Sequence, residues 1–204
     1  SMNRITTIGL DLAKKVFQVH GVDAEGKVVV ARKLRRKEVL AFFAKLAPCQ
    51  VGMEACGSAH HWARVLQGQG HTVRLIASQF VKPYVKSNKN DAKDAEAICE
   101  AMSRRTMRLI KAKTVEQQDY QATHRIRSEL MSHRTAKANQ IRGLVTEYGL
   151  VAPLQMASLR AAIPRWLEDA DNGLTDRFRA LLHGLWDDLL TLDQRIETLN
   201  GDIE

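Results

Sequence analysis

The sequence predicts a mixed α/β domain followed by a region of long helices. Short apolar runs alternate with amphipathic helical patterns up to about residue 110, and no convincing strand follows residue 113. A heptad repeat rich in leucine then occupies the end of the chain. We therefore expect two domains, an α/β domain at residues 1–113 and a helical domain at 114–204.

Three strand-like runs open the first domain, at 5–11, 16–22 and 27–33. The residues Asp23-Ala24-Glu25-Gly26 supply a turn between the second run and the third. Because the three runs are close in sequence, we expect them to form an antiparallel meander.

The rest of the first domain alternates helix and strand, which predicts a mixed sheet flanked by helices. The expected elements are a helix at 37–46, a strand at 50–54, a helix from a Ser58 cap to about 67, a strand at 72–77 and a helix from Asp91 to about 103. The inward side of the last helix is expected to carry Ala95, Ile98, Cys99 and Met102. The segment around Pro83 is expected to be partly irregular.

The second domain is expected to contain one long helix at 115–148, ended by Gly149, and a last helix that begins near Thr175. The prolines in 150–173 predict a connector with short helices. The last helix carries an a/d seam of Phe178, Leu182, Leu185, Leu189, Leu192, Ile196, Leu199 and Ile203. This spacing predicts a coiled coil, whose partner is either the first helix or another subunit.

The bulk properties favour a nucleic-acid partner inside a cell. The chain has 204 residues, a formal net charge of +8 and a pI of about 9.6. No apolar stretch is long enough for a transmembrane helix, and no signal peptide is visible. The three cysteines lack a C-x-x-C pair and are expected to be reduced, cytosolic and mostly buried. Ser1 before Met2 is expected to be a cloning remnant, and the lack of a stop signal in the last helix suggests a piece of a longer protein.

Charge differs sharply between the two long helices. Residues 104–142 hold ten Lys and Arg residues against three acids, whereas 171–204 hold eight acids against three Arg residues. The candidates for contact with a nucleic-acid backbone are Arg104, Arg105, Arg108, Arg125, Arg127, Arg134 and Lys137. The alternative is that the acidic helix simply neutralises the basic one.

Four acidic residues have the placement expected of a metal-dependent nuclease. Asp11 and Glu54 each end an apolar strand, and Asp91 and Asp94 share one face of a helix start. Each acid alone has a bland structural explanation, such as a helix cap for Asp91. Together they predict a site for Mg²⁺ or Mn²⁺, with Asp11 bridging two ions about 4 Å apart for phosphodiester chemistry.

Other polar residues carry weaker signals. Lys14, Lys15 and Lys89 lie near the acids and are candidates for phosphate contacts, although solvated lysines explain them equally well. The pair His60-His61 has no matching acid or cysteine and is expected to be structural. No nucleophile elbow, P-loop or H-E-x-x-H pattern occurs.

Three segments resemble a known family. They are IGLDLAK at 8–14, MEACG at 53–57 and NKNDAKDA at 88–95. They resemble the DEDD-type transposases of bacterial insertion sequences of the IS110 family, and the resemblance covers essentially the whole chain. The departure is Asn90, which stands where a small hydroxyl residue is common in the family.

The resemblance implies a RuvC-like, RNase H-like domain followed by a coiled-coil region. It implies a recombinase that cleaves and joins DNA strands, guided by a structured RNA, with Mg²⁺ or Mn²⁺ held by Asp11, Glu54, Asp91 and Asp94. It also implies a dimer or tetramer assembled through the helical region, in the bacterial cytoplasm with the nucleoid. A C-terminal domain with a serine nucleophile is expected outside these residues, so that this chain holds half of a composite site.

Three other functions remain open at this point. A stand-alone junction resolvase would use the same four acids with water as the nucleophile. An RNA-binding and assembly module would use the basic helix and the heptad seam without catalysis. A sugar-kinase or actin-like ATPase also begins with a Gly-x-Asp strand, but the sequence lacks the second Gly-rich phosphate loop that this class needs.

Overall fold

The computed structural model describes residues 5–85 and 91–203. Of Asp91 it describes the backbone but not the side chain. The chain divides into two compact units, Ser1–Thr114 and Val115–Glu204, and each is described separately. No helix among the described residues is both long enough and apolar enough to cross a membrane.

The first unit is built on a six-stranded mixed sheet in the order β3-β2-β1-β4-β5-β6. The strands are β1 (Thr7–Asp11), β2 (Val16–Val22), β3 (Val28–Arg35), β4 (Gln50–Glu54), β5 (Thr72–Ile76) and β6 (Leu109–Ile110). The predicted antiparallel meander is confirmed in β1, β2 and β3, while β1, β4 and β5 run parallel and β6 pairs antiparallel to β5. This order and these directions are consistent with an RNase H-like fold.

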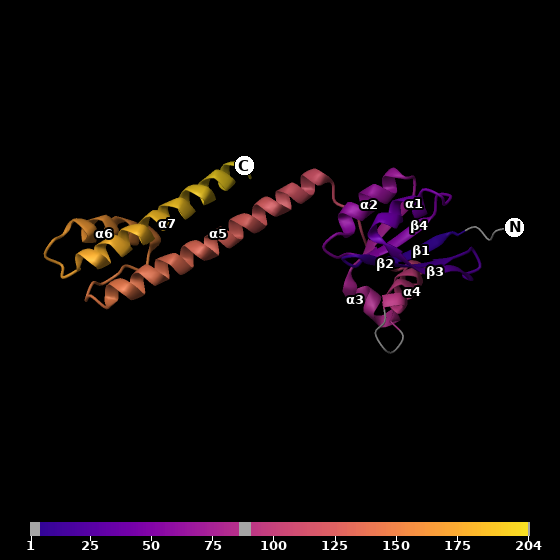
Figure 1. The fold of residues 1–204 in the computed structure, drawn as a ribbon, viewed down its shortest axis with the longest axis horizontal. Helices are drawn as coiled ribbons and strands as arrows, with labels where there is room; N and C mark the ends of the chain where they lie inside the picture. Colours follow the sequence, from indigo (N-terminus) through magenta and orange to yellow (C-terminus); the bar gives the residue numbers. More distant parts are fainter. Residues whose placement is uncertain (1–4, 86–90, 204) are drawn as a thin grey trace. The chain divides into compact units, whose positions relative to one another are not determined.

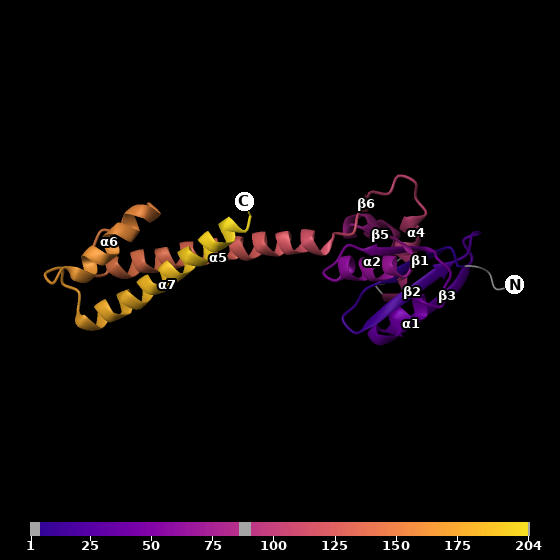
Figure 2. The ribbon, with the colours of Figure 1, turned by 90° about the horizontal axis from the view of Figure 1, so that it is seen from above.

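One face of the sheet packs on α1 (Val39–Phe43) and α2 (Ala59–Gly68). Alternation along the strands sends side chains such as Ile8, Leu10 and Met53 to this face, where each is fully buried. The opposite face is covered by α4 (Asp91–Met102), which contacts β1, β2 and β4 (Figures 1 and 2). The predicted inward side of this helix is confirmed, because Ala95, Ile98 and Cys99 are buried and Met102 is half-buried.

The first helix differs from its prediction. Instead of one helix at 37–46, a short 3₁₀ helix, η1 (Arg36–Glu38), leads into the five-residue α1. The following amides of Lys45 and Leu46 bond to carbonyls three residues earlier, so the last turn tightens and the α-helix ends early.

The predicted Ser58 cap also fails. Ser58 precedes α2 but its side chain makes no capping hydrogen bond, because its backbone is not in the extended conformation that a cap needs. The segment around Pro83, expected to be partly irregular, contains two short elements, α3 (Ser78–Val81) and the 3₁₀ helix η2 (Lys82–Tyr84).

The second unit contains α5 (Val115–Thr146), α6 (Met156–Glu168) and α7 (Asp176–Gly201). The two predicted long helices are confirmed, with Gly149 at a φ of +76° after α5 and Thr175 accepting a capping bond from the amide of Phe178. The expectation of several short helices in the connector is wrong. A single 13-residue helix, α6, forms there and contains Pro164 within it.

Helices α5 and α7 lie side by side in antiparallel directions (Figures 1 and 2). Residues further along α5 contact residues earlier in α7: Arg127 bonds to Asn200, and Lys137 bonds to Asp188. Beyond the end of α5, the ring of Tyr148 stacks on that of Phe178, with 4.1 Å between the ring centres. The predicted seam of α7 is buried or half-buried at every position, and its core packs with Ala138, Ile141 and Val145 of α5. Among the described residues, the seam from Phe178 to Leu189 therefore packs on α5 of the same chain.

Candidate active site

The tips of two neighbouring strands bring the first two acids to one edge of the sheet. Asp11 ends β1 and Glu54 ends β4, and these strands are parallel neighbours. Gly9 pairs with Gly52 across the ladder, so the acids that stand two residues further along lie opposite each other on the same face. Both carboxylates are half-buried.

The same two glycines allow α4 to approach this face of the sheet. A Cβ atom at Gly9 would lie 2.0 Å from the carbonyl oxygen of Ala95 and 2.6 Å from the amide nitrogen of Cys99. A Cβ atom at Gly52 would lie 2.4 Å from Cγ of Met102. Because side chains are absent at these points, the helix backbone rests directly on β1 and carries Asp94 toward the strand tips.

The approach of α4 places three of the four predicted acids around one cavity. Asp11, Glu54 and Asp94 line a cavity of about 470 Å³ together with Val81, Lys82 and Val85. The side chain of Asp91 and the whole of Lys89 lie outside the described residues. The structure thus brings together Asp11, Glu54 and Asp94, the three predicted acids whose side chains it describes.

The donor set of this cavity suits a hard divalent cation. Carboxylate oxygens around a space large enough for water and phosphate are the ligands that Mg²⁺ and Mn²⁺ prefer. Among the described side chains, no group of three His, Cys, Asp or Glu residues is gathered closely enough to hold a metal ion by itself. The chemistry of the donors therefore fits a metal whose remaining ligands would be water, substrate oxygens or Asp91.

Lys82 is a lining residue that the sequence analysis did not single out. It is the first residue of η2, which follows β5 and α3 in the chain. Its side chain is exposed and lines the acidic cavity. The signal that could have found it is topological, because loops after neighbouring parallel strands converge at the same edge of a sheet.

The predicted cations of the first unit have different surroundings. Lys14 and Lys15 are exposed in the turn between β1 and β2, and Arg105 and Arg108 are exposed after α4. Arg104 bonds to Glu100 at 3.2 Å and lies over the ring of Tyr84, so it already has partners within its own unit.

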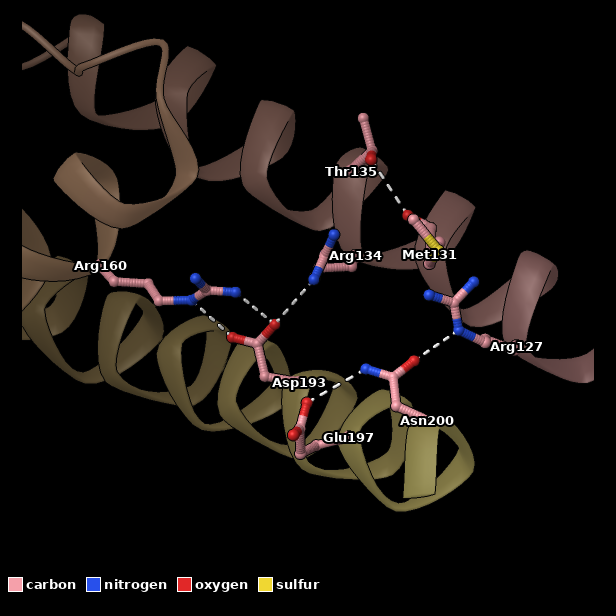
Figure 3. Close-up of polar contacts among 8 residues, drawn as sticks. All are labelled: Arg127, Met131, Arg134, Thr135, Arg160, Asp193, Glu197 and Asn200. Atoms are coloured by element: carbon pink, nitrogen blue, oxygen red, sulfur yellow. Dashed lines mark hydrogen bonds and ion pairs between the residues drawn. The ribbon is translucent and has the colours of Figure 1, made fainter. Parts of the chain in front are cut away.

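The predicted cations of α5 are mostly engaged with acidic or polar groups of α7 (Figure 3). Arg134 lies 3.4 Å from Asp193, which also accepts a bond of 2.7 Å from Arg160 of α6. Arg127 donates to the side chain of Asn200 at 2.6 Å. Lys137 pairs with Asp188 at 2.9 Å, whereas Arg125 is exposed. The structure thus assigns an intramolecular role to Arg127, Arg134 and Lys137, and their contact with nucleic acid remains a prediction.

His60 has a structural role, in keeping with its expected one. Its Nδ1 accepts a hydrogen bond of 3.0 Å from the amide of Lys113, whose carbonyl accepts a bond of 2.6 Å from Arg64. Partial burial, with the nearby charges of Lys113 and Arg64, lowers the pKa of His60 below its usual 6.5. The neutral imidazole therefore helps to fasten the end of the first unit to α2.

The cysteines offer no reactive thiol in the core. Cys49 and Cys99 are buried and Cys56 is exposed. Burial raises the pKa of Cys49 and of Cys99 to about 11, so both remain protonated thiols at neutral pH.

Comparison with known proteins gives a family match over most of the chain. Residues 8–150 match the model of a protein family described as "Transposase", the DEDD transposases of IS110 elements. A "Probable family 20 transposase" of Pseudomonas aeruginosa is 52% identical over 201 residues, which are 98% of this chain and 60% of that protein.

Two further relatives are named after their insertion sequences. The transposase of element IS1111A from Coxiella burnetii is 46% identical over 204 residues, all of this chain and 55% of that protein. The transposase of element IS1328 from Yersinia enterocolitica is 41% identical over 165 residues, which are 80% of this chain and 49% of that protein. The chain thus spans about half to three fifths of the length of these curated relatives.

Proposed function

Since the chain belongs to the DEDD transposase family of IS110 elements, we propose that it carries the metal-dependent half of a transposase active site. The substrate in this proposal is the DNA of an insertion sequence. The observation that carries the proposal is that Asp11, Glu54 and Asp94 line one cavity.

In this proposal the acidic side chains hold two divalent cations, Mg²⁺ or Mn²⁺. Asp11, at the tip of the central β1 strand, Glu54 and Asp94 would be the ligands, with Asp91 as the fourth acid of the motif. The chemistry that such a pair of cations supplies is activation of the attacking oxygen and stabilisation of the leaving oxygen in phosphodiester cleavage.

The remaining groups of the cavity position the substrate. Lys82, at the mouth, is placed to bind a non-bridging phosphate oxygen, since an exposed ammonium is a mobile point charge with three donors. Val81, which is buried, and half-buried Val85 form an apolar wall that limits how far water surrounds the carboxylates. In this proposal Lys82 binds the phosphate by charge, and Val81 and Val85 limit its position by steric contact.

The helical unit serves assembly in this proposal. The antiparallel hairpin of α5 and α7 would have the knobs-into-holes packing of a coiled coil and would present its outer faces to a second subunit and to a structured guide RNA. Complete strand transfer would need the parts of the protein that the longer relatives have in addition, including the serine nucleophile expected from the family resemblance.

Mn²⁺ binding in solution tests the proposal. In the 204-residue chain, Asp11→Asn should weaken Mn²⁺ binding at least tenfold, measured by the loss of free Mn²⁺ signal in electron paramagnetic resonance. The matched control is Glu25→Gln, which changes an exposed acid in the turn between β2 and β3 by the same charge. Equal Mn²⁺ affinity of the two variants would contradict the proposal.

The same cavity also suits a resolvase-type nuclease, in which water attacks the phosphodiester and no serine is needed. Metal-dependent cleavage of a four-way DNA junction by this chain alone, lost in Asp11→Asn, would favour this second candidate over a composite transposase site. Metal binding without cleavage would favour the transposase.

A further inference from the structure

The meander of β1, β2 and β3 carries a set of cations that lack acidic partners. Residues 12–38 hold eight Lys and Arg residues against three acids. None of these eight side chains forms an ion pair with any described residue, although Arg32 and Arg36 lie over aromatic rings. An unmatched cationic surface of this kind is the electrostatic footprint of a polyanion site.

The register of the sheet aligns part of this surface with the acidic cavity. Asp11 pairs with Gln18 across β1 and β2, and Gln18 pairs with Lys33 across β2 and β3. Side chains that face each other in a ladder point to the same side of the sheet, so Asp11, Gln18 and Lys33 share the side that α4 covers. Arg35, two residues along β3, shares it too. Lys33 and Arg35 are exposed, whereas Gln18 is 4% exposed.

A second cavity, of about 410 Å³, lies over this part of the sheet. Its floor includes Gln18 and Lys33, and its wall is Lys93 and Glu96 of α4. The first turns of α4 therefore separate the acidic cavity, which Asp94 lines, from a cavity in which cations outnumber acids. Neighbouring strands are about 5 Å apart, so the Cα atoms of Lys33 and Asp11 are about 10 Å apart, close enough for one DNA strand to contact both residues.

We propose that Lys33 and Arg35 of β3 bind the phosphodiester backbone of the DNA strand that enters the acidic cavity. The inference rests on the proposed function, since it names the track by which the substrate reaches Asp11. The two cations position the strand by charge and do not read its sequence.

Edge protection is the competing explanation for these cations. β3 is the outermost strand of the sheet, and charged side chains on such strands prevent pairing with other chains. Edge protection requires only charge of either sign on β3, whereas DNA binding requires positive charge at the positions in line with Asp11. The two explanations therefore predict different effects of charge removal and of charge reversal.

Binding of a fluorescein-labelled 20-nucleotide single strand to the 204-residue chain, followed by anisotropy at several salt concentrations, tests the proposal. The double variant Lys33→Gln with Arg35→Gln should bind about 10- to 30-fold more weakly near 0.1 M salt, with a salt slope smaller by about 1.4. The charge-conserving pair Lys33→Arg with Arg35→Lys should restore both quantities. A matched control is Lys45→Gln with Arg177→Gln, two exposed cations without an ion pair to any described residue.

Several results would overturn the inference. The first is that the unchanged chain does not bind DNA at low salt. The second is that the double variant and its control lose the same amount of DNA affinity. The third is that the double variant loses affinity for RNA of the same length but not for DNA. Aggregation of the Lys33→Glu, Arg35→Glu variant, with DNA affinity unchanged in the Gln variant, would identify edge protection as the role. The readout is DNA binding in the presence of EDTA, so it needs no metal ion at the acidic cavity. Failure of the metal-site proposal and failure of this one are therefore separable.

Discussion

Lys33 and Arg35 of β3 have different surroundings from most of the predicted cations of α5. Arg127, Arg134 and Lys137 of α5 bind polar or acidic side chains of α7, whereas Lys33 and Arg35 of β3 pair with no acid among the described residues. In the sequence, the basic helix is the more conspicuous of the two regions. A basic segment therefore indicates a nucleic-acid partner only when its cations are not already paired with other side chains of the same chain.

Gly9 of the first unit and Gly184 of the second differ in how closely other atoms approach them. Gly9 lies beneath the backbone of α4, so a single methyl group there has no room. Gly184, in the middle of α7, has no atom within 4 Å of an added Cβ. The first unit therefore depends on close packing at its site, and the helical hairpin does not depend on this glycine at all.

The largest expected effect is that of Gly9→Ala. The new Cβ meets backbone atoms of α4 rather than a mobile side chain, so α4 must move away from β1. We expect a loss of about 3 kcal/mol in the free energy of unfolding of the first unit and weaker Mn²⁺ binding, since Asp94 moves with the helix. Denaturant unfolding read by hydrogen exchange of β1 and α4 amides measures the first effect. Unchanged protection would show that the close approach is not required.

A smaller effect is expected when the shared acid of the hairpin is removed. Asp193→Ala leaves Arg134 and Arg160 without their common partner in a partly buried position, which should cost about 2 kcal/mol of hairpin stability. Asp187→Ala is the control, because its pair with His183 is exposed on both sides and should contribute less than about 0.5 kcal/mol. Equal thermal stability of the two variants would mean that the α5 cations are not committed to the hairpin, and the contrast with β3 would disappear.

Gly184→Ala should stabilise the hairpin. An exposed glycine within a helix costs about 1 kcal/mol relative to alanine, and the structure leaves space for the methyl group. A higher midpoint for the helical unit in thermal unfolding by circular dichroism would agree with this. A lower midpoint would indicate that α7 packs against something at this position in the assembled protein.

The smallest expected effect is that of pH on the contact between His60 and Lys113. Because the folded-state pKa of His60 is lowered, protonation is disfavoured in the folded state. The stability that the contact contributes is therefore present above pH 6.5 and is lost as pH falls through the lower, folded-state value. Nuclear magnetic resonance titration should give a midpoint for His60 below 6.5, with the Lys113 amide shifting at the same midpoint. A midpoint at or above 6.5 would contradict this.

The sequence predicted the strands at the site better than the short helices around it. β4 has its predicted bounds, because an apolar run that ends in an acid leaves few alternatives for Gln50–Glu54. The helix at 37–46 is shorter than predicted, since the tightening of its last turn into 3₁₀ bonds is not visible in periodicity. The 13-residue helix α6 differs from the short helices expected in the connector, because the helix continues through Pro164.

At the site, sequence could predict the acids but not the groups that meet them in space. Asp11 and Glu54 are visible because each ends an apolar strand, and Asp94 is visible because it shares a helix face with Asp91. Lys82 belongs to a loop that reaches the cavity only through the parallel arrangement of β4 and β5. The partners of Arg134 and Lys137 are more than fifty residues away in sequence, so their pairing depends on the register of the hairpin.

The most direct test of the metal site is anomalous scattering from crystals of this chain soaked in Mn²⁺, with crystals of Asp11→Asn beside them. We expect an anomalous peak among Asp11, Glu54 and Asp94 that is lost in the variant. Full occupancy in the variant, or a peak confined to another part of the molecule, would contradict it.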